Sequence, residues 1–263
     1  MMDRRLFAAC CGALGLAVLP VAAAPKKAAK PVGTRKPKLT ASQVLDKYVV
    51  ATGGQAAYDK ITSLAIGGTL EMKAQGVSGT FAMKTKSPDK MLVTQTIQNI
   101  GDMKQGFDGK VGWSQDPING LRTLQGPELE QMKFGAAQSG SKTWRQLYTK
   151  SEMLGYRKVG AAETYAIRVT PKVGKPIVMY YDTKSFLLLR TDMLAEGPQG
   201  TVPTESYTSD YRTVGGVKMP YATRQRVGGV AEVVMKVTEA KVNPAIDDSE
   251  FAKPAAPPKP ATK

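Results

Sequence analysis

Residues 204–242 read TESYTSDYRTVGGVKMPYATRQRVGGVAEVVMKVTEAKV, and this stretch decides the fold. It holds three segments rich in β-branched and aromatic residues, which favour strands: 204–212, 217–227 and 230–242. Gly215-Gly216 and Gly228-Gly229 separate these segments. Glycine pairs at such positions are typical of tight turns between antiparallel strands. The stretch therefore predicts three consecutive antiparallel strands.

The same pattern extends over most of the chain. In residues 77–86, for example, Val77, Phe81 and Met83 alternate with polar residues, as expected for a half-buried strand. The alternation of strands and helices that marks a parallel sheet is missing. We therefore predict an α+β fold, mostly antiparallel β, with a few helices against one face. The other expected strands are 64–72, 91–97, 103–107, 111–115, 121–124, 154–159, 163–170, 177–182 and 186–193.

Two helices have clear start signals. Thr40 followed by Gln43 predicts a capped helix, in which Val44, Leu45, Tyr48 and Val49 repeat at helical spacing before Gly53-Gly54 ends it. Gly126-Pro127-Glu128 predicts the start of another, which we expect to run to about Ala137. Shorter helical segments are expected at 56–61 and 143–149.

Histidine is absent from the whole chain, and the two cysteines, Cys10 and Cys11, lie in an apolar N-terminal segment. Once that segment is removed, no Ser-His or Cys-His pair, no thiolate nucleophile and no zinc site of thiols or imidazoles can form. Chemistry would then fall to carboxylates, lysine, tyrosine or serine, or the protein would act by binding.

The N-terminal segment has the features of an export signal. Arg4-Arg5 precede an apolar run, Ala8 to Ala23, which is too short to span a membrane, so we expect a signal peptide over 1–23. The arginine pair fits an ordinary secretory signal or a twin-arginine signal. We therefore expect a periplasmic protein, with a basic Pro/Ala/Lys linker at 24–40, one β-rich domain at 41–251 and a disordered Pro/Ala/Lys tail at 252–263.

Most of the positive charge lies outside the domain. The net charge is +15, of which residues 25–40 carry +6 and residues 252–263 carry +3, while residues 41–251 carry only +5. The tails are either solubilising spacers or contacts to an anionic membrane surface or cell wall. The domain shows no basic stripe interleaved with aromatic residues, so we expect no nucleic-acid partner.

Several apparent catalytic patterns fail on geometry. Ser87-Pro88-Asp89-Lys90 matches Ser-x-x-Lys, but it falls in a turn and no Lys-Thr-Gly follows. Two carboxylate pairs are poorly placed: Glu128 and Glu130 diverge on a helix, and Glu205 and Asp210 would face opposite sides of a strand. Asp247-Asp248 alone would make a weak cation site. We predict no catalytic residue, metal site or cofactor.

Methionine gives the positive signal. Ten methionines follow the leader, and several fall in expected strands, where β-branched residues are more usual. Flexible, polarizable methionines suit a surface that accepts irregular apolar partners, although they also fill cores. The candidate cavity lining for a lipid is Phe81, Met83, Met91, Val93, Trp113, Met179, Tyr181, Leu187, Leu189, Met219 and Met235.

Several segments, in order along the domain, resemble those of periplasmic outer-membrane lipoprotein-sorting-like proteins of the LolA/LolB type. They are Ala51–Tyr58, Gly106–Trp113, Tyr180–Lys184 with Leu187–Arg190, and Tyr207–Tyr221. The resemblance implies an incomplete, half-open antiparallel β-barrel, covered by helices, with a hydrophobic cavity for lipoprotein acyl chains. The lid-holding arginine of the carrier and the membrane-inserting loop of the receptor have no assignable counterpart in this sequence.

Three functions follow as hypotheses. The first is an exported protein that holds lipid or lipoprotein acyl chains in an apolar cavity. The second is a non-catalytic envelope scaffold or accessory module, whose interior would be filled. The third is a hydrolase that uses carboxylates or a Ser-Lys pair, and it would need two carboxylates facing each other in a cleft.

Overall fold

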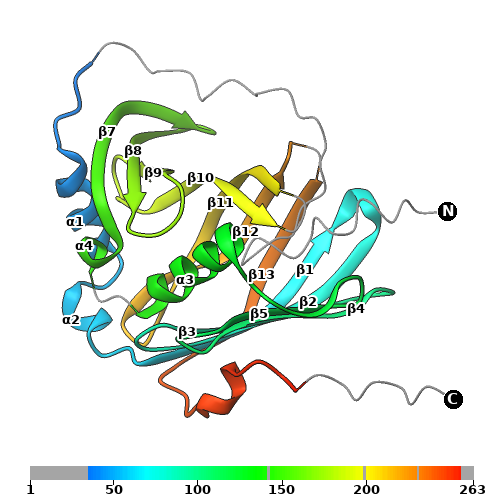
Figure 1. Ribbon diagram of the computed structural model, residues 1–263. Helices are drawn as coiled ribbons and strands as arrows, with labels where there is room; N and C mark the ends of the chain where they lie inside the picture. Colours follow the sequence, from blue (N-terminus) through cyan, green and yellow to red (C-terminus); the bar gives the residue numbers. More distant parts are fainter. Residues whose placement is uncertain (1–34, 141–142, 198–199, 230, 256–263) are drawn as a thin grey trace, which may run out of the picture.

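The structure, a computed structural model, describes residues 35–140, 143–197, 200–229 and 231–255 (Figure 1). Within these ranges the chain forms a 13-stranded sheet in which every neighbouring pair is antiparallel. The predicted fold class is confirmed. The strands are β1 (Ser63–Met72), β2 (Val77–Lys86), β3 (Lys90–Ile97), β4 (Gly101–Phe107), β5 (Gly112–Asp116), β6 (Gly120–Thr123), β7 (Tyr148–Val159), β8 (Ala162–Pro171), β9 (Ile177–Asp182), β10 (Leu188–Gly197), β11 (Gly200–Val214), β12 (Val217–Val227) and β13 (Ala231–Val242).

The sheet consists of two meanders joined at its centre. Its strand order is β6-β5-β4-β3-β2-β1-β13-β12-β11-β10-β9-β8-β7. Strands β1 to β6 therefore run outward to one edge and β13 to β7 run outward to the other, while β1 pairs with β13 in the middle. The edge strands β6 and β7 do not pair with each other, so the curled sheet stays open (Figure 1).

Two helices occupy the connection between the two edges. Helix α3 (Gly126–Gly140) follows β6, and the short helix α4 (Trp144–Leu147) precedes β7. Because this connection must pass from one edge to the other, α3 crosses the concave face of the sheet (Figure 1). There it packs against β2, β3, β4, β5 and β10. Helix α3 thus lies inside the curl.

The N-terminal helix α1 (Ala41–Ala51) begins with the predicted capping box. Gln43 N donates to Thr40 Oγ1 at 3.2 Å, and Thr40 N donates to Gln43 Oε1 at 2.8 Å. Its apolar face packs on the β7–β9 end of the sheet, where the Tyr48 and Tyr181 rings lie 5.2 Å apart. Helix α2 (Gln55–Tyr58) follows directly. This end of the concave face is therefore filled by side chains.

The convex face is covered at one place by the C-terminal 3-10 helix η3 (Asp248–Phe251), shown below the sheet in Figure 1. The Trp113 indole nitrogen donates to the Phe251 carbonyl oxygen at 2.8 Å, and both side chains are fully buried. Lys86 and Lys90 bind the Asp248 carboxylate at 2.8 and 2.5 Å. Another short 3-10 helix, η2 (Lys73–Gln75), joins β1 to β2.

The predicted strand boundaries hold for β2, β9 and β12 but not for β7, which starts at Tyr148 rather than at 154. Register shifts between Tyr148 and Lys150 and between Met153 and Gly155 break the alternation there. Gly155 adopts φ 102°, which a side chain would resist. These bulges interrupt the alternation of apolar and polar residues, so the sequence pattern predicted only the second half of the strand.

The predicted leader and most of both tails, 1–34 and 256–263, lie outside the described residues. Residues 35–40, within the predicted linker, lie against the domain: Arg35 stacks on the Tyr156 ring at 4.3 Å and pairs with Glu163 at 3.1 Å. In the described part of the chain, no helix combines the length and apolarity needed to span a bilayer.

Candidate functional site

A cavity of about 340 Å³ lies between α3 and the concave face of the sheet. Helix α3 contributes its roof, and strands from both arms of the curled sheet contribute its walls. Most of the lining is apolar and flexible, with five methionines among it. The apolar lining residues are Met83, Met91, Leu124, Met132, Phe134, Tyr148, Ile177, Met179, Leu188 and Met193.

A second hollow, of about 420 Å³, adjoins the first at the start of α3. Its other wall is the β8–β9 turn with Val173, Gly174 and Lys175, and the 42 % exposed Leu194 lies at its rim. The two hollows share Gln131, Phe134, Ile177, Met193 and Glu196. They form one groove that leads from the surface to the space under α3.

Polar side chains also line the cavity, and three of them form a row across neighbouring strands. Thr191 of β10 pairs in register with Ser206 of β11, and Ser206 pairs with Gln225 of β12. All three line the cavity, as does Gln105 from β4 in the other arm of the sheet. The wall formed by β10–β12 can therefore donate and accept hydrogen bonds.

The charged side chains at the cavity are two glutamates, and each is paired with a cation. Arg122 binds Glu128 through two hydrogen bonds, 2.6 and 2.8 Å long, and these bonds raise the pKa of Arg122. The Lys175 ammonium lies 2.5 Å from the Glu196 carboxylate. Among the described residues, the lining of the main cavity includes no lysine or arginine.

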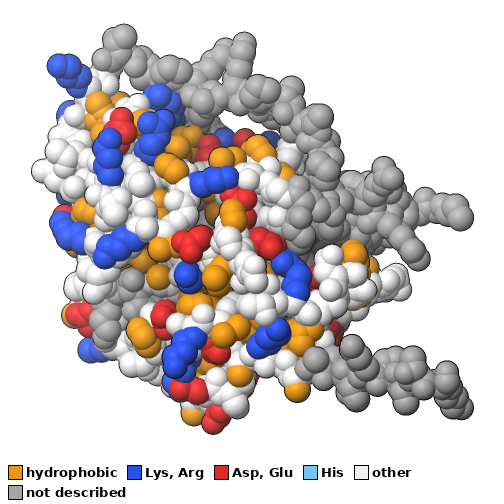
Figure 2. Space-filling view, in the orientation of Figure 1, with side chains coloured by type: hydrophobic (Ala, Val, Ile, Leu, Met, Phe, Trp, Pro, Cys, Tyr) orange, Lys and Arg blue, Asp and Glu red, His pale blue; other side chains and the backbone are white. Residues whose placement is uncertain are grey.

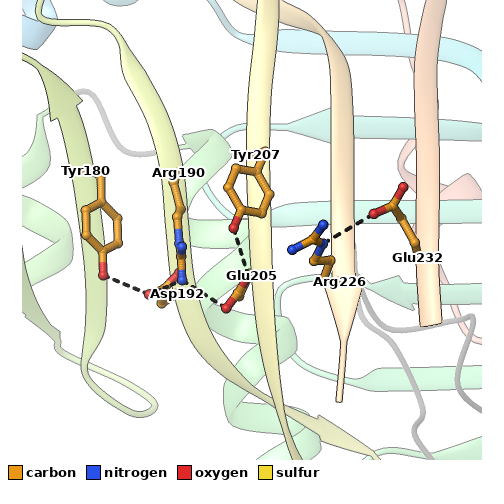
Figure 3. Close-up of polar contacts among 7 residues, drawn as sticks. All are labelled: Tyr180, Arg190, Asp192, Glu205, Tyr207, Arg226 and Glu232. Atoms are coloured by element: carbon orange, nitrogen blue, oxygen red, sulfur yellow. Dashed lines mark hydrogen bonds and ion pairs between the residues drawn. The ribbon is translucent and has the colours of Figure 1, made fainter. Parts of the chain in front are cut away.

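The convex face of the same strands carries a second polar cluster, a ladder of arginines, tyrosines and carboxylates (Figure 3). Successive side chains of a strand point to opposite faces, so Arg190 and Asp192 alternate with the cavity residues Thr191 and Met193. Arg190 binds Asp192 at 2.5 Å and Glu205 at 3.0 Å. The pairing continues across β12 and β13.

Aromatic rings fill the space between these charges. The Arg190 guanidinium lies 5.2 Å from the ring centres of both Tyr180 and Tyr207. Tyr180 donates to Asp192 and Tyr207 donates to Glu205, each at 2.8 Å. Burial and then these acidic partners raise the pKa of both tyrosines.

The ladder is balanced in charge. At its far end Arg224 and Arg226 share the Glu232 carboxylate, at 3.1 and 3.3 Å. Each arginine of the ladder therefore has a carboxylate partner, and the ladder itself carries no surplus charge that would mark it as a binding site. On the face seen in Figure 2, positive and negative side chains are likewise interspersed. The ladder supports the sheet, and the cavity on the other side is the stronger candidate site.

The comparisons with known proteins agree with this architecture. No family model and no curated protein matches the sequence. Solved structures do match: a DUF1329 family protein from Desulfovibrio piger (TM-score 0.55, 12% identity, 81% of this chain and 97% of that one) and LolA superfamily protein NE2245 from Nitrosomonas europaea (0.54, 13%, 82% and 98%). A putative outer membrane lipoprotein-sorting protein domain from Vibrio parahaemolyticus is similar as well (0.51, 10%, 80% and 95%).

The chain has the LolA-like fold. This confirms the resemblance seen in the sequence at the level of fold. At these identities the likeness establishes the architecture, while ligand and role have to be argued from the chain's own residues.

Within the LolA-like fold, three of the residues expected to line a cavity do so: Met83, Met91 and Met179. Trp113 lies on the opposite face instead, beneath η3. The reason is strand alternation: Gly112, its neighbour, pairs with Phe107, which packs on the concave side with Met91 and Met132. Trp113 must therefore point to the convex side.

The other predicted lining residues lie around the cavity rather than in it. Phe81 and Met235 are buried in a core between β1–β4 and β11–β13. Val93 packs beside Met91, and Tyr181 is buried under α1. A final group is half-buried and outside the lining: Leu187, Leu189 and Met219.

The sequence-based prediction missed the contribution of α3 and the polar row. Met132 and Phe134 of α3 form part of the cavity roof. One signal for the row was present: strand β11 is polar on both of its faces, with Thr204 and Ser206 alternating with Glu205 and Tyr207. A strand that is paired on both sides within the sheet and polar on both faces is better explained by a cavity on one face than by a packed core.

Residues of the remaining sequence motifs make structural contacts. Lys90 of the Ser-x-x-Lys pattern binds Asp248. Asp210 adopts a positive φ of 52° and pairs with Arg212 at 2.7 Å, whereas Glu205 binds Arg190. No group of three or more potential metal-ligating side chains occurs in the described ranges.

Proposed function

We propose that this protein is an exported, non-catalytic carrier that holds a lipid or a lipoprotein acyl chain in the cavity beneath α3. The observation that carries the proposal is an apolar, methionine-rich cavity that opens to the surface. Its volume of about 340 Å³ falls within the range of about 300–1,000 Å³ typical of ligand pockets. It also far exceeds the ~10–15 Å³ needed for one water, which argues against a filled scaffold.

Simple energetics make an acyl chain a suitable occupant. Burying each CH₂ group gains about 0.8 kcal/mol, so ten methylenes gain ~8 kcal/mol before the cost of association. Methionine side chains adapt their shape to such a chain without the strain that β-branched residues would impose. Binding of this kind needs neither histidine nor cysteine.

A hydrolase remains the competing function, because Glu128 and Glu196 both line the cavity. A glycosidase or esterase would need two carboxyl groups free to act on a substrate across a cleft. Both glutamates are instead held in ion pairs, Glu128 with Arg122 and Glu196 with Lys175. This pairing favours a binding role.

The test is to fill the cavity from within α3. A Cβ on Gly135 would lie 3.0 Å from the Met91 terminal methyl group and point into the lining. Gly135→Leu should abolish uptake of a fluorescent fatty acid or lipid while the protein stays folded, since leucine is a better helix former than glycine. Ala137→Leu, on the same helix but outside the lining, should bind normally.

Native mass spectrometry of the purified protein gives an independent readout. The wild type should carry co-purified lipid or acylated peptide, recovered with its ester bonds intact, and Gly135→Leu should carry none. An empty wild type that also takes up no lipid would contradict the carrier function. Recovery of cleaved lipid would favour the hydrolase.

A further inference from the structure

The polar wall of the cavity and the charged side chains around it determine which chemical group of a lipid the cavity can accept. The row Thr191–Ser206–Gln225 spans three adjacent strands on the concave face. Thr204 beside the row is 2 % exposed and donates to the Val202 carbonyl oxygen at 3.5 Å, whereas Thr191 and Ser206 line the cavity itself. Keeping hydroxyl groups beside an interior space costs free energy unless the occupant of that space offers them a polar partner. A pure hydrocarbon chain offers no such partner.

The charge distribution excludes an anionic partner at this depth. The charged side chains among the described lining of the main cavity are Glu128 and Glu196; their partners Arg122 and Lys175 do not line it, although Lys175 lines the adjoining hollow. A carboxylate or phosphate placed in the cavity would meet two glutamates and no cation from the main lining. Desolvating such a charge without a partner is strongly unfavourable.

The side chains of the row are neutral and offer both donors and acceptors. Serine and threonine hydroxyls donate to a carbonyl oxygen, and a glutamine amide can do the same. An ester carbonyl next to an aliphatic chain fits both the row and the methionine walls around it. A free fatty acid is ionised at neutral pH. Its chain fits between the methionine walls, but its carboxylate does not fit beside the row.

Building on the proposed function, we infer that the cavity selects neutral acyl esters over free fatty acids, with the ester group against Thr191, Ser206 and Gln225 and the chain among the methionines. The ester of a free glycerolipid and that of a diacylglyceryl group on a protein share this chemistry.

The test compares ligands with one chain length in the purified full-length protein. Displacement of the neutral probe N-phenyl-1-naphthylamine is measured for monolauroylglycerol and for laurate, at a pH of about 8. Monolauroylglycerol should bind at least tenfold more tightly than laurate. Equal affinities, or tighter binding of laurate, would overturn the inference even if the carrier function stands. Failure of the probe and of both ligands to bind would instead refute the carrier function.

Substitutions in the row test whether its hydroxyl groups produce the selectivity for the ester. Thr191→Val with Ser206→Ala should weaken monolauroylglycerol about five- to tenfold and leave probe binding unchanged, because only hydrogen bonds to the ester are lost. Ser209→Ala with Thr213→Val removes the same groups from exposed positions of β11 and should change neither. A double variant that weakens probe and ester equally would show that the row supports packing alone, which would overturn the inference.

A last comparison identifies the source of the ester. An S-diacylglyceryl-cysteine peptide is measured beside the corresponding diacylglycerol. Tighter binding of the peptide supports the inference with a lipoprotein as the source, and equal or tighter binding of the diacylglycerol supports it with a free lipid.

Discussion

Two arginines of this chain pair with an aspartate two residues away, in very different surroundings. The Arg190 side chain is 14 % exposed and binds both Asp192 and Glu205. The Arg212 side chain is 58 % exposed, pairs with Asp210 and lies over the Tyr221 ring. Exposed ion pairs add little to stability, whereas removing the cation from a mostly buried cluster leaves carboxylates facing each other. Loss of the arginine should therefore destabilise the protein at position 190 but not at position 212, although the sequence spacing of the two pairs is the same.

We expect Arg190→Met to lower the free energy of unfolding by about 2 kcal/mol, since methionine keeps the aliphatic stem but leaves Asp192 and Glu205 without their cation. Urea unfolding monitored by circular dichroism measures the change. Arg212→Met is the matched control and should leave the midpoint unchanged. Equal effects of the two substitutions would show that the ion pairs of Arg190 stabilise the fold no more than the exposed pair of Arg212 does.

At the scale of elements, the 3-10 helix η3 covers Trp113 on the convex face. Phe251 is completely buried, and its carbonyl oxygen accepts the Trp113 indole hydrogen bond at 2.8 Å. On this side of the sheet η3 also packs against β3. The environment of Trp113 therefore reports on whether η3 is docked, and it is separated from the cavity by the sheet.

Phe251→Ala should release η3 and destabilise the protein by about 3 kcal/mol, the usual cost of removing a buried phenyl ring. In a Trp144→Phe background, the emission of Trp113 should shift to the red as water reaches the indole. Ile118→Ala, at a 59 % exposed position of the β5–β6 turn, provides the control. Unchanged emission after Phe251→Ala would place Trp113 elsewhere, for example in the cavity as first expected.

These elements also show how far the sequence alone could lead. Local sequence signals were sufficient to predict the helix cap at Thr40, the strand β2 and the antiparallel class of the sheet, because capping and alternation act within a few residues. The candidate site was harder. Alternation tells which side chains share a face, as for Met83 and Phe81, but not whether that face meets a cavity or a packed core. That depends on where α3 crosses the sheet, which no local pattern encodes.

At the scale of the whole molecule, the absence of histidine shapes the response to pH. Hydrogen bonds from Lys86 and Lys90 lower the pKa of Asp248 to about 2. Arg145 lowers the pKa of Asp46, and Arg224 lowers that of Glu232. A carboxyl group whose pKa is lower in the folded state stabilises the fold above its unfolded pKa, and this contribution is lost as the pH falls through the folded value.

We therefore expect a constant free energy of unfolding between about pH 5 and 8, where no side chain of ordinary pKa in the domain titrates. Stability should then decline from about pH 4 toward pH 2, as these carboxylates are protonated. Urea midpoints measured across this range check the profile. A transition near pH 6 to 7 would contradict it, because it would require a strongly shifted group within the domain.

The central pair of the sheet joins the first strand to the last, from Leu64 opposite Val242 to Glu71 opposite Val234. The two meanders can form hairpins as they emerge from the ribosome, but their junction has to wait for residues near the end of the domain. Long-range pairings of this kind close slowly. The centre of the sheet therefore cannot form until β13 has been synthesised, and until then β1 and the hairpins that follow it lack the strand that joins the two meanders.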